Sequence, residues 1–291
     1  MSKQLTKSVN TEKQADESTN SNHLIHQLRK AAGEYYFYNK SPEKVKNLWD
    51  SLSTTIKKEF FDKGEGTWII FQYAAGFNDI EFMEECWGYA GNKVQRAQLL
   101  KGYFYGAYSK AAQNNCKESL EKLWEYAQEV KTQDELLAMS LTRAAQKAAE
   151  NGHTFIILDI WNQLSSLGSH GLKYKIDMLK SGSKYADGSV TGYKALWKAT
   201  ENEHTDTAAV LLYLCKNTIK DFDEHEAFNN ISTTGEYNIE EPFFLMAVTC
   251  AQLLNNIADL TISNTSHAIN ESSSEALGLA VEDNQSVQSH L

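Results

Sequence analysis

Apolar residues recur through the middle of this chain with the spacing of a helix face and not with the alternation of a strand. One such face is made by Leu137, Leu141, Ala145 and Ala148, at positions i, i+4, i+8 and i+11. The face narrows to alanine, and small residues let a neighbouring helix approach closely. After a short polar turn a second apolar run begins at Ile156. This stretch therefore predicts two helices joined by a tight turn.

The same pattern repeats along the chain. Three ungapped segments place a small pair twelve residues before a tryptophan: Ala74–Ala75 before Trp87, Ala111–Ala112 before Trp124, and Ala148–Ala149 before Trp161. Both intervals between these tryptophans are 37 residues. A fourth copy, with Ala199–Thr200 and Leu212, follows 51 residues later, and a degenerate earlier copy ends at Trp49. A fixed period of this length is typical of stacked helical repeats.

The residues at the helix ends support the same interpretation. The first helix of each unit stops in register at Asn78, Asn115 and Gly152, which are residue types that tolerate the left-handed conformation at a helix C-terminus. Thr132 and Glu135 have the spacing of a capping box, which predicts that a first helix begins there. Each unit is expected to be an αα-hairpin that buries its apolar faces only by stacking on its neighbours.

We therefore predict an all-α fold of stacked helix-turn-helix repeats, an α-solenoid of about five repeats plus a capping helix over Pro242–Leu260. Only 2 prolines and 16 glycines disfavour an all-β fold, which needs more turn residues. The repeat domain is expected to span residues 23–261. Residues 1–22 and 262–291 are rich in Ser, Asn and charged residues, and we expect disordered tails because they cannot bury enough apolar surface.

Residues 165–192 interrupt the period between the third and fourth copies. They contain five glycines, together with a stretch over Leu172–Lys180 that predicts an additional helix. Gly64 and Gly66 are expected to form a second break, a loop between helices. Long insertions in solenoids commonly project from one face and act as binding elements, and a tolerated flexible loop is the alternative.

The chain carries 28 basic and 38 acidic residues, which gives a formal net charge of −10 and a pI near 5.3. Because that field repels polyanions, we expect no nucleic-acid partner. No stretch is long and apolar enough to span a membrane, and the polar N-terminus lacks the apolar core of a signal peptide. These features predict a cytoplasmic protein, unless a signal-independent system exports it into a host cell.

Residues with recognisable chemistry are sparse. The four cysteines, Cys86, Cys116, Cys215 and Cys250, form no CxxC pair and are expected to be reduced, buried thiols. The sequence holds no phosphate-binding loop, GxSxG or HExxH motif. We expect a non-enzymatic protein with no catalytic residue, metal site or cofactor, although 38 acidic residues leave an acid–base pair open. The tryptophan column is expected to be inter-repeat core, with a ligand cage as the alternative.

The turn sequences resemble those of ankyrin repeats. Ala148–His153, followed by an aliphatic helix, is similar to the family's Ala-Ala-x-x-Gly-His, and Lys194–Thr200 takes the place of its Thr-Pro-Leu-His-x-Ala-Ala. The resemblance covers residues 66–215 and departs from the family in its longer period and longer first helix. It implies a protein-binding scaffold without catalysis, in which His153 and His204 tie the turns by hydrogen bonding. Arrays of this kind with polar tails also resemble ankyrin-type effectors of intracellular bacteria.

The resemblance places the binding surface at the turns, where the two residues after each small pair point toward the partner. The predicted binding residues are Gly76, Phe77, Gln113, Asn114, Glu150, Asn151, Glu201 and Asn202, bordered by the lysine column Lys110, Lys147 and Lys198. Three cations in register are expected to form a ladder for an acidic partner, with plain solvated lysines as the alternative.

The expected function is a protein–protein interaction scaffold, whose partner is another protein. Two alternatives stay open at this point. One is an enzyme or toxin-like module with a site in the concave groove, and the other is a structural subunit of a larger assembly. A pocket of carboxylates or histidines with strongly shifted pKa values would favour the enzyme. A large exposed apolar patch on the concave face would favour the binding module.

Overall fold

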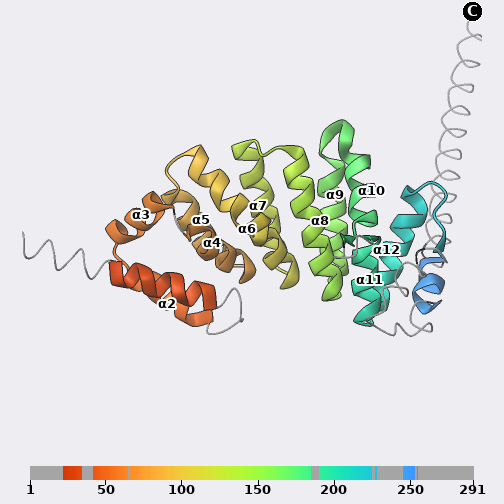
Figure 1. Cartoon of the computed structure of the whole chain (residues 1–291), viewed down its shortest axis with the longest axis horizontal. Coiled ribbons are helices and arrows are strands. Elements are labelled where there is room, and N and C mark those ends of the chain that lie inside the picture. Colours follow the sequence, from red (N-terminus) through yellow and green to blue (C-terminus); the bar gives the residue numbers. More distant parts are fainter. Residues whose placement is uncertain are drawn as a thin grey trace, which may run out of the picture.

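The computed structural model describes residues 22–34, 42–64, 66–184, 190–224, 227, 245–252 and 254. This part of the chain is all-α except for one two-stranded ladder, and its helices line up in an elongated array (Figure 1). Residues 22–34 are helical. The helices that follow are α2 (Pro42–Ser51), α3 (Thr54–Lys63), α4 (Thr67–Gly76), α5 (Ile80–Tyr89), α6 (Lys93–Gln113), α7 (Lys117–Val130), α8 (Asp134–Glu150), α9 (Thr154–Ser165), the 3-10 helix η1 (Gly168–His170), α10 (Gly171–Lys180), α11 (Lys194–Glu201) and α12 (Thr205–Thr218).

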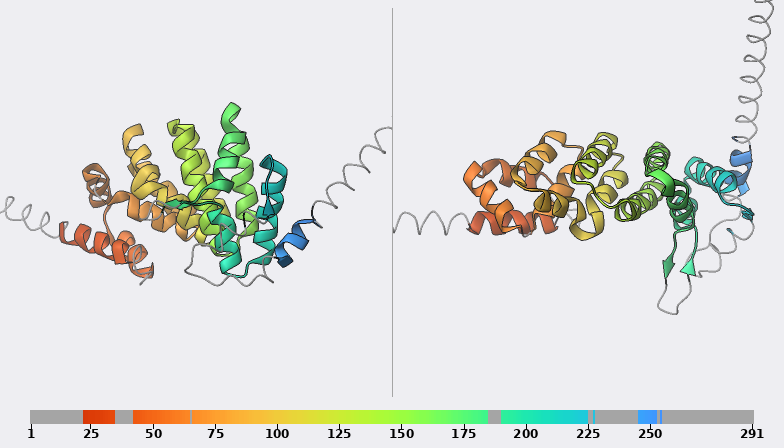
Figure 2. Two further views of the ribbon diagram at one scale, coloured as in Figure 1. Left: turned by 45° about the vertical axis from the view of Figure 1, so that its right-hand side comes forward. Right: turned by 90° about the horizontal axis from the view of Figure 1, so that it is seen from above.

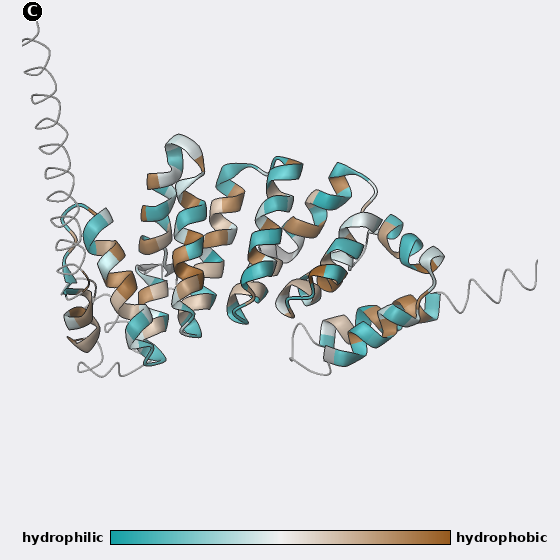
Figure 3. Ribbon diagram, turned by 180° about the vertical axis from the view of Figure 1, so that it is seen from behind, coloured by the Kyte–Doolittle hydropathy of each residue, from teal (hydrophilic) through white to brown (hydrophobic). Residues whose placement is uncertain are grey.

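Consecutive helices pair as hairpins, and the hairpins pack in two rows. α4 packs on α5, α6 on α7, α8 on α9, and α11 on α12. The first helices contact one another in the order α4, α6, α8, α11, while α5 contacts α7 and α9 contacts α12 (Figure 1, Figure 2). Hydrophobic and hydrophilic segments alternate along each helix (Figure 3), as expected when one side of a helix packs on its neighbours. The predicted αα-hairpins are present, and the fold is all-α and repeat-like.

Each hairpin turn is built in the same way. The small pairs are buried: Ala74–Ala75, Ala111–Ala112, Ala148–Ala149 and Ala199–Thr200. A backbone N–H then donates back across each turn at 2.8–3.1 Å, from Asp79 to Ala74, Cys116 to Ala111, His153 to Ala148, and His204 to Ala199. The chain reverses through a positive φ at Asn78, Asn115, Gly152 and Glu203. The prediction that the first helices end in register is confirmed.

The predicted capping box at Thr132 is wrong. α8 begins at Asp134, and its N-cap residue Gln133 makes no side-chain cap hydrogen bond. The reason lies in the preceding helix. Lys131 takes a left-handed φ of 53°, and the Thr132 N–H donates to the carbonyl of Ala127 at 3.0 Å. Thr132 therefore belongs to the C-terminal cap of α7 and is not available to start α8.

α3 and α4 together occupy the place that α6 occupies in the next hairpin. α6 runs without a break over 21 residues, whereas α3 ends at Lys63 and α4 begins at Thr67. Gly64 and Gly66 lie between them with φ of 68° and 75°. L-residues rarely adopt this conformation, so glycine breaks the helix here. The predicted loop at these two glycines is confirmed.

The insert over residues 165–192 does not simply project. α10 forms where the additional helix was predicted, but it packs on α8, α9, α11 and α12. Its side chains Tyr174, Met178 and Leu179 are buried. The part that extends from the array is the ladder of β1 (Ser183–Lys184) and β2 (Val190–Thr191), paired antiparallel (Figure 2). For α10, the prediction of a projecting element is wrong, because its apolar side completes the core between two hairpins.

Trp49 is held against the next hairpin by a hydrogen bond to a carboxylate and by a cation over its ring. The indole is fully buried, and its Nε1 donates to Glu85 Oε2 at 2.7 Å. Lys57 Nζ donates to the other oxygen of Glu85 at 2.8 Å and lies 4.8 Å from the centre of the Trp49 ring. These contacts satisfy the indole N–H and place a cation over its face. The predicted core role of Trp49 is confirmed.

The same arrangement recurs one hairpin later at Trp87. Trp87 is buried, its Nε1 donates to Glu129 Oε2 at 3.0 Å, and its ring stacks on Tyr126 with centroids 3.9 Å apart. Arg96 pairs with Glu129 and lies over the Trp87 ring. Trp124 and Trp161 instead are only partly buried at the edge of the core. The tryptophan column is therefore not uniform: its first two members are buried, and its last two lie at the edge of the core.

The contacts of Glu85 with Trp49 and Lys57 predict an acid-sensitive contribution to stability. Burial alone would raise the pKa of Glu85, but hydrogen bonds from Lys57 and Trp49 outweigh it and hold that pKa below its ordinary value. A carboxyl of this kind contributes stability above the unfolded-state pKa and loses it as the pH falls through the folded-state pKa. Glu85→Gln should lower the free energy of unfolding near neutral pH by less than about 1 kcal/mol, because Glu85 is partly exposed.

Urea denaturation between neutral pH and about pH 3 measures this effect. The gap between wild type and Glu85→Gln should close as the pH falls. Glu121→Gln, at an exposed carboxylate near Lys117 on α7, is the matched control and should show little gap at any pH. If the difference in unfolding free energy between wild type and Glu85→Gln stays constant down to about pH 3, the stabilising role of the Glu85 contacts with Trp49 and Lys57 is contradicted.

The C-terminal part is described only in part. Residues 245–252 and 254 are helical, and Ala247 and Ala251 are buried. This agrees with the predicted capping helix over Pro242–Leu260, whose other residues lie outside the described part of the chain. Residues 1–21 and 255–291, which include nearly all of both predicted tails, also lie outside it, so the domain limits 23–261 stay a prediction.

Candidate functional site

The predicted binding residues of the first turns divide into exposed and enclosed positions. Phe77 is 43% exposed, and its ring centroid lies 4.7 Å from that of Tyr73. Gly76, by contrast, is buried at the end of α4. Its carbonyl accepts hydrogen bonds from Asn114 Nδ2 at 2.7 Å and from Cys116 Sγ at 3.4 Å. The prediction that Gly76 faces a partner is wrong, and the Asn114 side chain joins two turns.

The histidines of the repeat column also join turns. His153 Nε2 donates to the carbonyl of Gln113 at 3.0 Å, and His204 Nε2 donates to the carbonyl of Glu150 at 3.2 Å. The sequence predicts that these histidines form hydrogen bonds at the turns, and they do. Each histidine, however, bonds to the turn of the preceding hairpin and not to its own turn. The backbone carbonyls of Gln113 and Glu150 are therefore engaged, and both side chains are partly buried.

The last two turns share one polar arrangement. Lys147 Nζ lies 2.5 Å from Glu150 Oε2, and Lys198 Nζ lies 2.6 Å from Glu201 Oε2. Asn151 Nδ2 donates to the Lys147 carbonyl, and Asn202 Nδ2 donates to the Lys198 carbonyl. The glutamates and asparagines thus close the ends of α8 and α11. In the expected lysine ladder, two of the three lysines are therefore ion-paired within their own helices.

Positive charge nevertheless accumulates on this side of the first helices. We name as the basic cluster Lys110 of α6, Arg143 and Lys147 of α8, and Lys194 and Lys198 of α11. Burial, followed by repulsion from Lys147, lowers the pKa of Lys110. Burial, followed by repulsion from Lys198, Lys147 and Arg143, lowers the pKa of Lys194 against the attraction of Glu150. The cluster thus gathers five cations, of which Lys147 and Lys198 are ion-paired with glutamates.

Arg143 and Lys194 were not identified from the sequence. Each lies four residues before a lysine of the predicted ladder, Arg143 before Lys147 and Lys194 before Lys198. Residues spaced by four share one side of a helix, so this recurrence was a readable signal. The signal is separate from the columns at the turns, because Arg143 and Lys194 lie on the helix surface that leads into each turn.

A pocket of about 440 Å³ adjoins the basic cluster, between α8, α10 and the start of α11. Arg143 and Lys194 belong to both the pocket and the cluster. The other lining side chains include Met139 and Gln146 of α8, Tyr174 of α10, and Ser181 just after α10. Ser181 Oγ accepts a hydrogen bond from Gln146 Nε2 at 2.9 Å, and the Ser181 carbonyl accepts one from the Lys194 backbone at 2.8 Å. These bonds join the segment after α10 to α8 and to the start of α11 beside the pocket.

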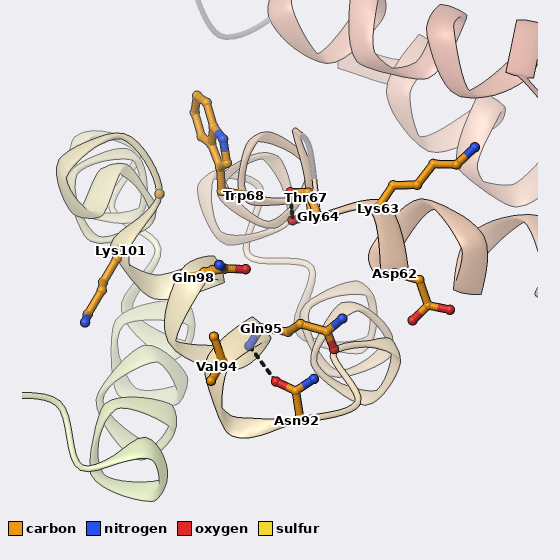
Figure 4. A pocket seen from close by; sticks show the side chains of 11 residues that line it. Asp62, Lys63, Gly64, Thr67, Trp68, Asn92, Val94, Gln95, Gln98 and Lys101 are labelled. Carbon is orange, nitrogen blue, oxygen red and sulfur yellow. Dashed lines mark hydrogen bonds between the residues drawn. The ribbon is translucent and has the colours of Figure 1, made fainter.

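A wider hollow of about 820 Å³ lies at the break between α3 and α4. It is lined by scattered polar side chains, among them Asp62, Gln95 and Gln98, while Trp68 points away from Gln95 (Figure 4). Gln95 and Asn92 serve the start of α6, where the Gln95 N–H donates to Asn92 Oδ1. The hollow therefore shows no convergent set of charged groups comparable with the basic cluster.

The described residues hold few other features of a chemical site. Among them, no group of three His, Cys, Asp or Glu side chains is placed to hold a metal ion. The described carboxylates with a shifted pKa are Glu85 and Glu118, both lowered and both outside the two cavities. None of the helices in the described ranges is both long and apolar enough to cross a membrane.

Comparison with known proteins gives no relative. No protein-family model, curated protein or solved structure matches this chain. What the protein does must therefore be inferred from its own residues.

Proposed function

We propose that this chain is a non-enzymatic scaffold that binds another protein through the basic cluster. In this proposal the array is an ankyrin-like α-solenoid of about five hairpin units. The units pair residues 22–34 with α2, α3–α4 with α5, α6 with α7, α8 with α9, and α10–α11 with α12, and the helix at 245–252 closes the end. The setting is a cytoplasm, either that of the producing cell or that of a host cell that receives the protein as an effector.

The observation that carries the proposal is the separation of charge. The chain as a whole has a net charge of −10, yet the basic cluster brings together five cations from three neighbouring first helices, of which Lys147 and Lys198 are paired with glutamates. Burial and mutual repulsion lower the pKa of Lys110 and of Lys194, so gathering these cations opposes folding. A fold tolerates such repulsion when a ligand of opposite charge relieves it, and complementary charge also speeds association.

Neutralising the lysine ladder tests the proposal. The full chain is immobilised, and proteins captured from a cytoplasmic extract are compared for wild type and for Lys110→Gln/Lys147→Gln/Lys198→Gln. We expect the triple variant to lose captured proteins that wild type holds at low salt and releases at high salt. Lys44→Gln/Lys58→Gln/Lys220→Gln removes the same charge at exposed lysines outside the cluster and should capture like wild type.

Equal capture by both triple variants would contradict the proposal, because binding would then not depend on the basic cluster. Melting temperatures of all three proteins show that any loss of capture is not a loss of folding.

A further inference from the structure

The pocket beside the basic cluster exists because of the insert. One wall of the pocket is α8, a first helix of the repeat that corresponds to α6 in the neighbouring hairpin. The other wall is α10, which belongs to the insert. Tyr174, Met178 and Leu179 anchor α10 in the core, so this wall is rigidly placed. The pocket is therefore formed by the fold itself. It adjoins the basic cluster at Arg143 and Lys194, which belong to both.

The pocket is positive at one end. Arg143 and Lys194 line it there, with Lys147 and Lys198 close enough to lower the pKa of Lys194 further. The backbone of Lys194 is held by Ser181. Its ammonium group, however, has neither a hydrogen bond nor an ion pair with any residue in the described part of the chain. A carboxylate placed between Arg143 and Lys194 would provide that missing partner.

The middle of the pocket is apolar. Met139, one helical turn before Arg143 on the same side of α8, is 51% exposed. Ala138 lies beside it, and Tyr174 of α10, whose side chain is mostly buried, also lines the pocket. A thioether adapts to varied apolar side chains, so an exposed methionine in a pocket suits a peptide contact. The far end carries Glu135 and the ion pair of Lys173 with Asp177 at 3.6 Å.

The spacing of these two subsites matches an extended peptide. Met139 and Arg143 are four residues apart on a helix, which separates them by about 6 Å along its axis. In an extended strand, side chains two residues apart point to the same side and lie about 6.6 Å apart. A segment with a carboxylate and an apolar side chain at positions i and i+2 can therefore contact both subsites at once.

From this geometry we infer that the pocket binds an extended acidic segment of a partner protein with the pattern Glu-x-Leu. Asp can take the place of Glu, and another aliphatic residue can take the place of Leu. The carboxylate lies between Arg143 and Lys194, and the aliphatic side chain lies against Met139 and Tyr174. This inference rests on the proposed scaffold function and adds to it the sequence pattern that the scaffold recognises.

The test uses the full chain and the probe peptide fluorescein-Gly-Ser-Glu-Ser-Leu-Ser-Gly, with binding followed by fluorescence polarisation. Replacing Glu or Leu of the probe by Gln should each weaken binding by about tenfold. Moving Glu next to Leu, without the intervening Ser, should weaken it similarly, because the two side chains then point to opposite sides. Equal affinity of all four peptides would overturn the inference.

Variants of the chain locate the peptide. Arg143→Gln/Lys194→Gln and, separately, Met139→Gln should each weaken binding of the probe by about tenfold or more. Lys44→Gln/Lys58→Gln and Phe155→Gln are the matched controls, because Phe155 is 79% exposed but lies outside the pocket. Both controls should bind like wild type. Unchanged melting temperatures exclude misfolding. Wild-type affinity in both pocket variants would overturn the inference.

The competing occupant is the chain's own C-terminal region, where Glu275, Ala276 and Leu277 have the same pattern. If Glu275→Gln/Leu277→Gln strengthens probe binding severalfold, the chain's own segment fills the pocket and the inference of a partner segment is overturned. The failure of the scaffold proposal looks different. If the probe does not bind but the triple variant Lys110→Gln/Lys147→Gln/Lys198→Gln still loses captured proteins, only the inference about the pocket is wrong. If neither assay shows an effect, both the inference and the scaffold proposal are contradicted.

Discussion

Truncating Trp49 to alanine should lower the free energy of unfolding by about 3–5 kcal/mol. The indole is fully buried, and its ring centroid lies 5.1–6.4 Å from those of Phe60, Phe61, Phe82 and Tyr89. Its removal leaves a cavity between two hairpins and takes from Glu85 one of its two hydrogen-bond donors. Urea denaturation followed by circular dichroism and by tryptophan fluorescence measures the loss.

Trp124→Ala is the natural comparison. Trp124 holds the same place in the repeat but is only partly buried, so its truncation should cost about 1–2 kcal/mol. The order of the two losses is the informative result. If both variants melt like wild type, the hairpins do not stack through this column, and if Trp124→Ala costs more, the burial described for α2 and α7 is wrong.

Adding one methyl group at Gly102 should be almost as damaging, with an expected loss of about 3 kcal/mol. A Cβ atom at Gly102 would lie 2.1 Å from Trp68 Cβ, an atom too close to the backbone to rotate away. α4 and α6 would have to separate. That separation would also stretch the hydrogen bond from Gln72 Nε2 to the Gly102 carbonyl, now 2.8 Å, and Gln72 is buried.

Gly88→Ala is the matched control for Gly102→Ala. Gly88 is also helical, in α5, but a Cβ atom there would meet nothing within 4 Å. Alanine should then stabilise the helix by about 0.5–1 kcal/mol, because glycine loses more conformational freedom on folding. At Gly106 the three nearest atoms all belong to the side-chain amide of Gln72, at 2.5–2.6 Å. This amide is the end of a side chain and not backbone, so Gly106→Ala should fall between the two. Equal melting temperatures for Gly102→Ala and Gly88→Ala would contradict the close approach of α4 and α6.

Several features could be predicted because neighbours in the sequence decide them. A small pair followed by Asn78, Asn115 or Gly152 ends a helix through local backbone bonds, and the structure shows each of those ends. The additional helix after Ser165 was predicted for the same reason, since the apolar spacing of Tyr174 and Met178 is a local pattern. Even the break at Gly64 and Gly66 is local, because it depends on backbone conformations that few other residues adopt.

The candidate site was predicted less well. Lys110, Lys147 and Lys198 do lie together, but their charge depends on what surrounds them. The ion pairs of Lys147 with Glu150 and of Lys198 with Glu201 are local, because the partners are three residues apart on one helix. The addition of Lys194 to the cluster, by contrast, follows from how α8 and α11 sit side by side. Gly76 illustrates the same limit, because an exposed position in one isolated hairpin becomes buried once Asn114 of the next hairpin contacts its carbonyl.

By itself, then, the amino-acid sequence determined the helical hairpin, its period and its turns, since hydrogen bonds and apolar spacing within one unit specify them. Only the tertiary structure decided which tryptophans are buried, that α10 joins the core, and that a pocket opens between α8 and α10. Those outcomes depend on contacts between residues 30 or more positions apart, such as Trp49 with Glu85 or Gln146 with Ser181. No local pattern encodes such pairs, because each is set by the packing of one hairpin on the next.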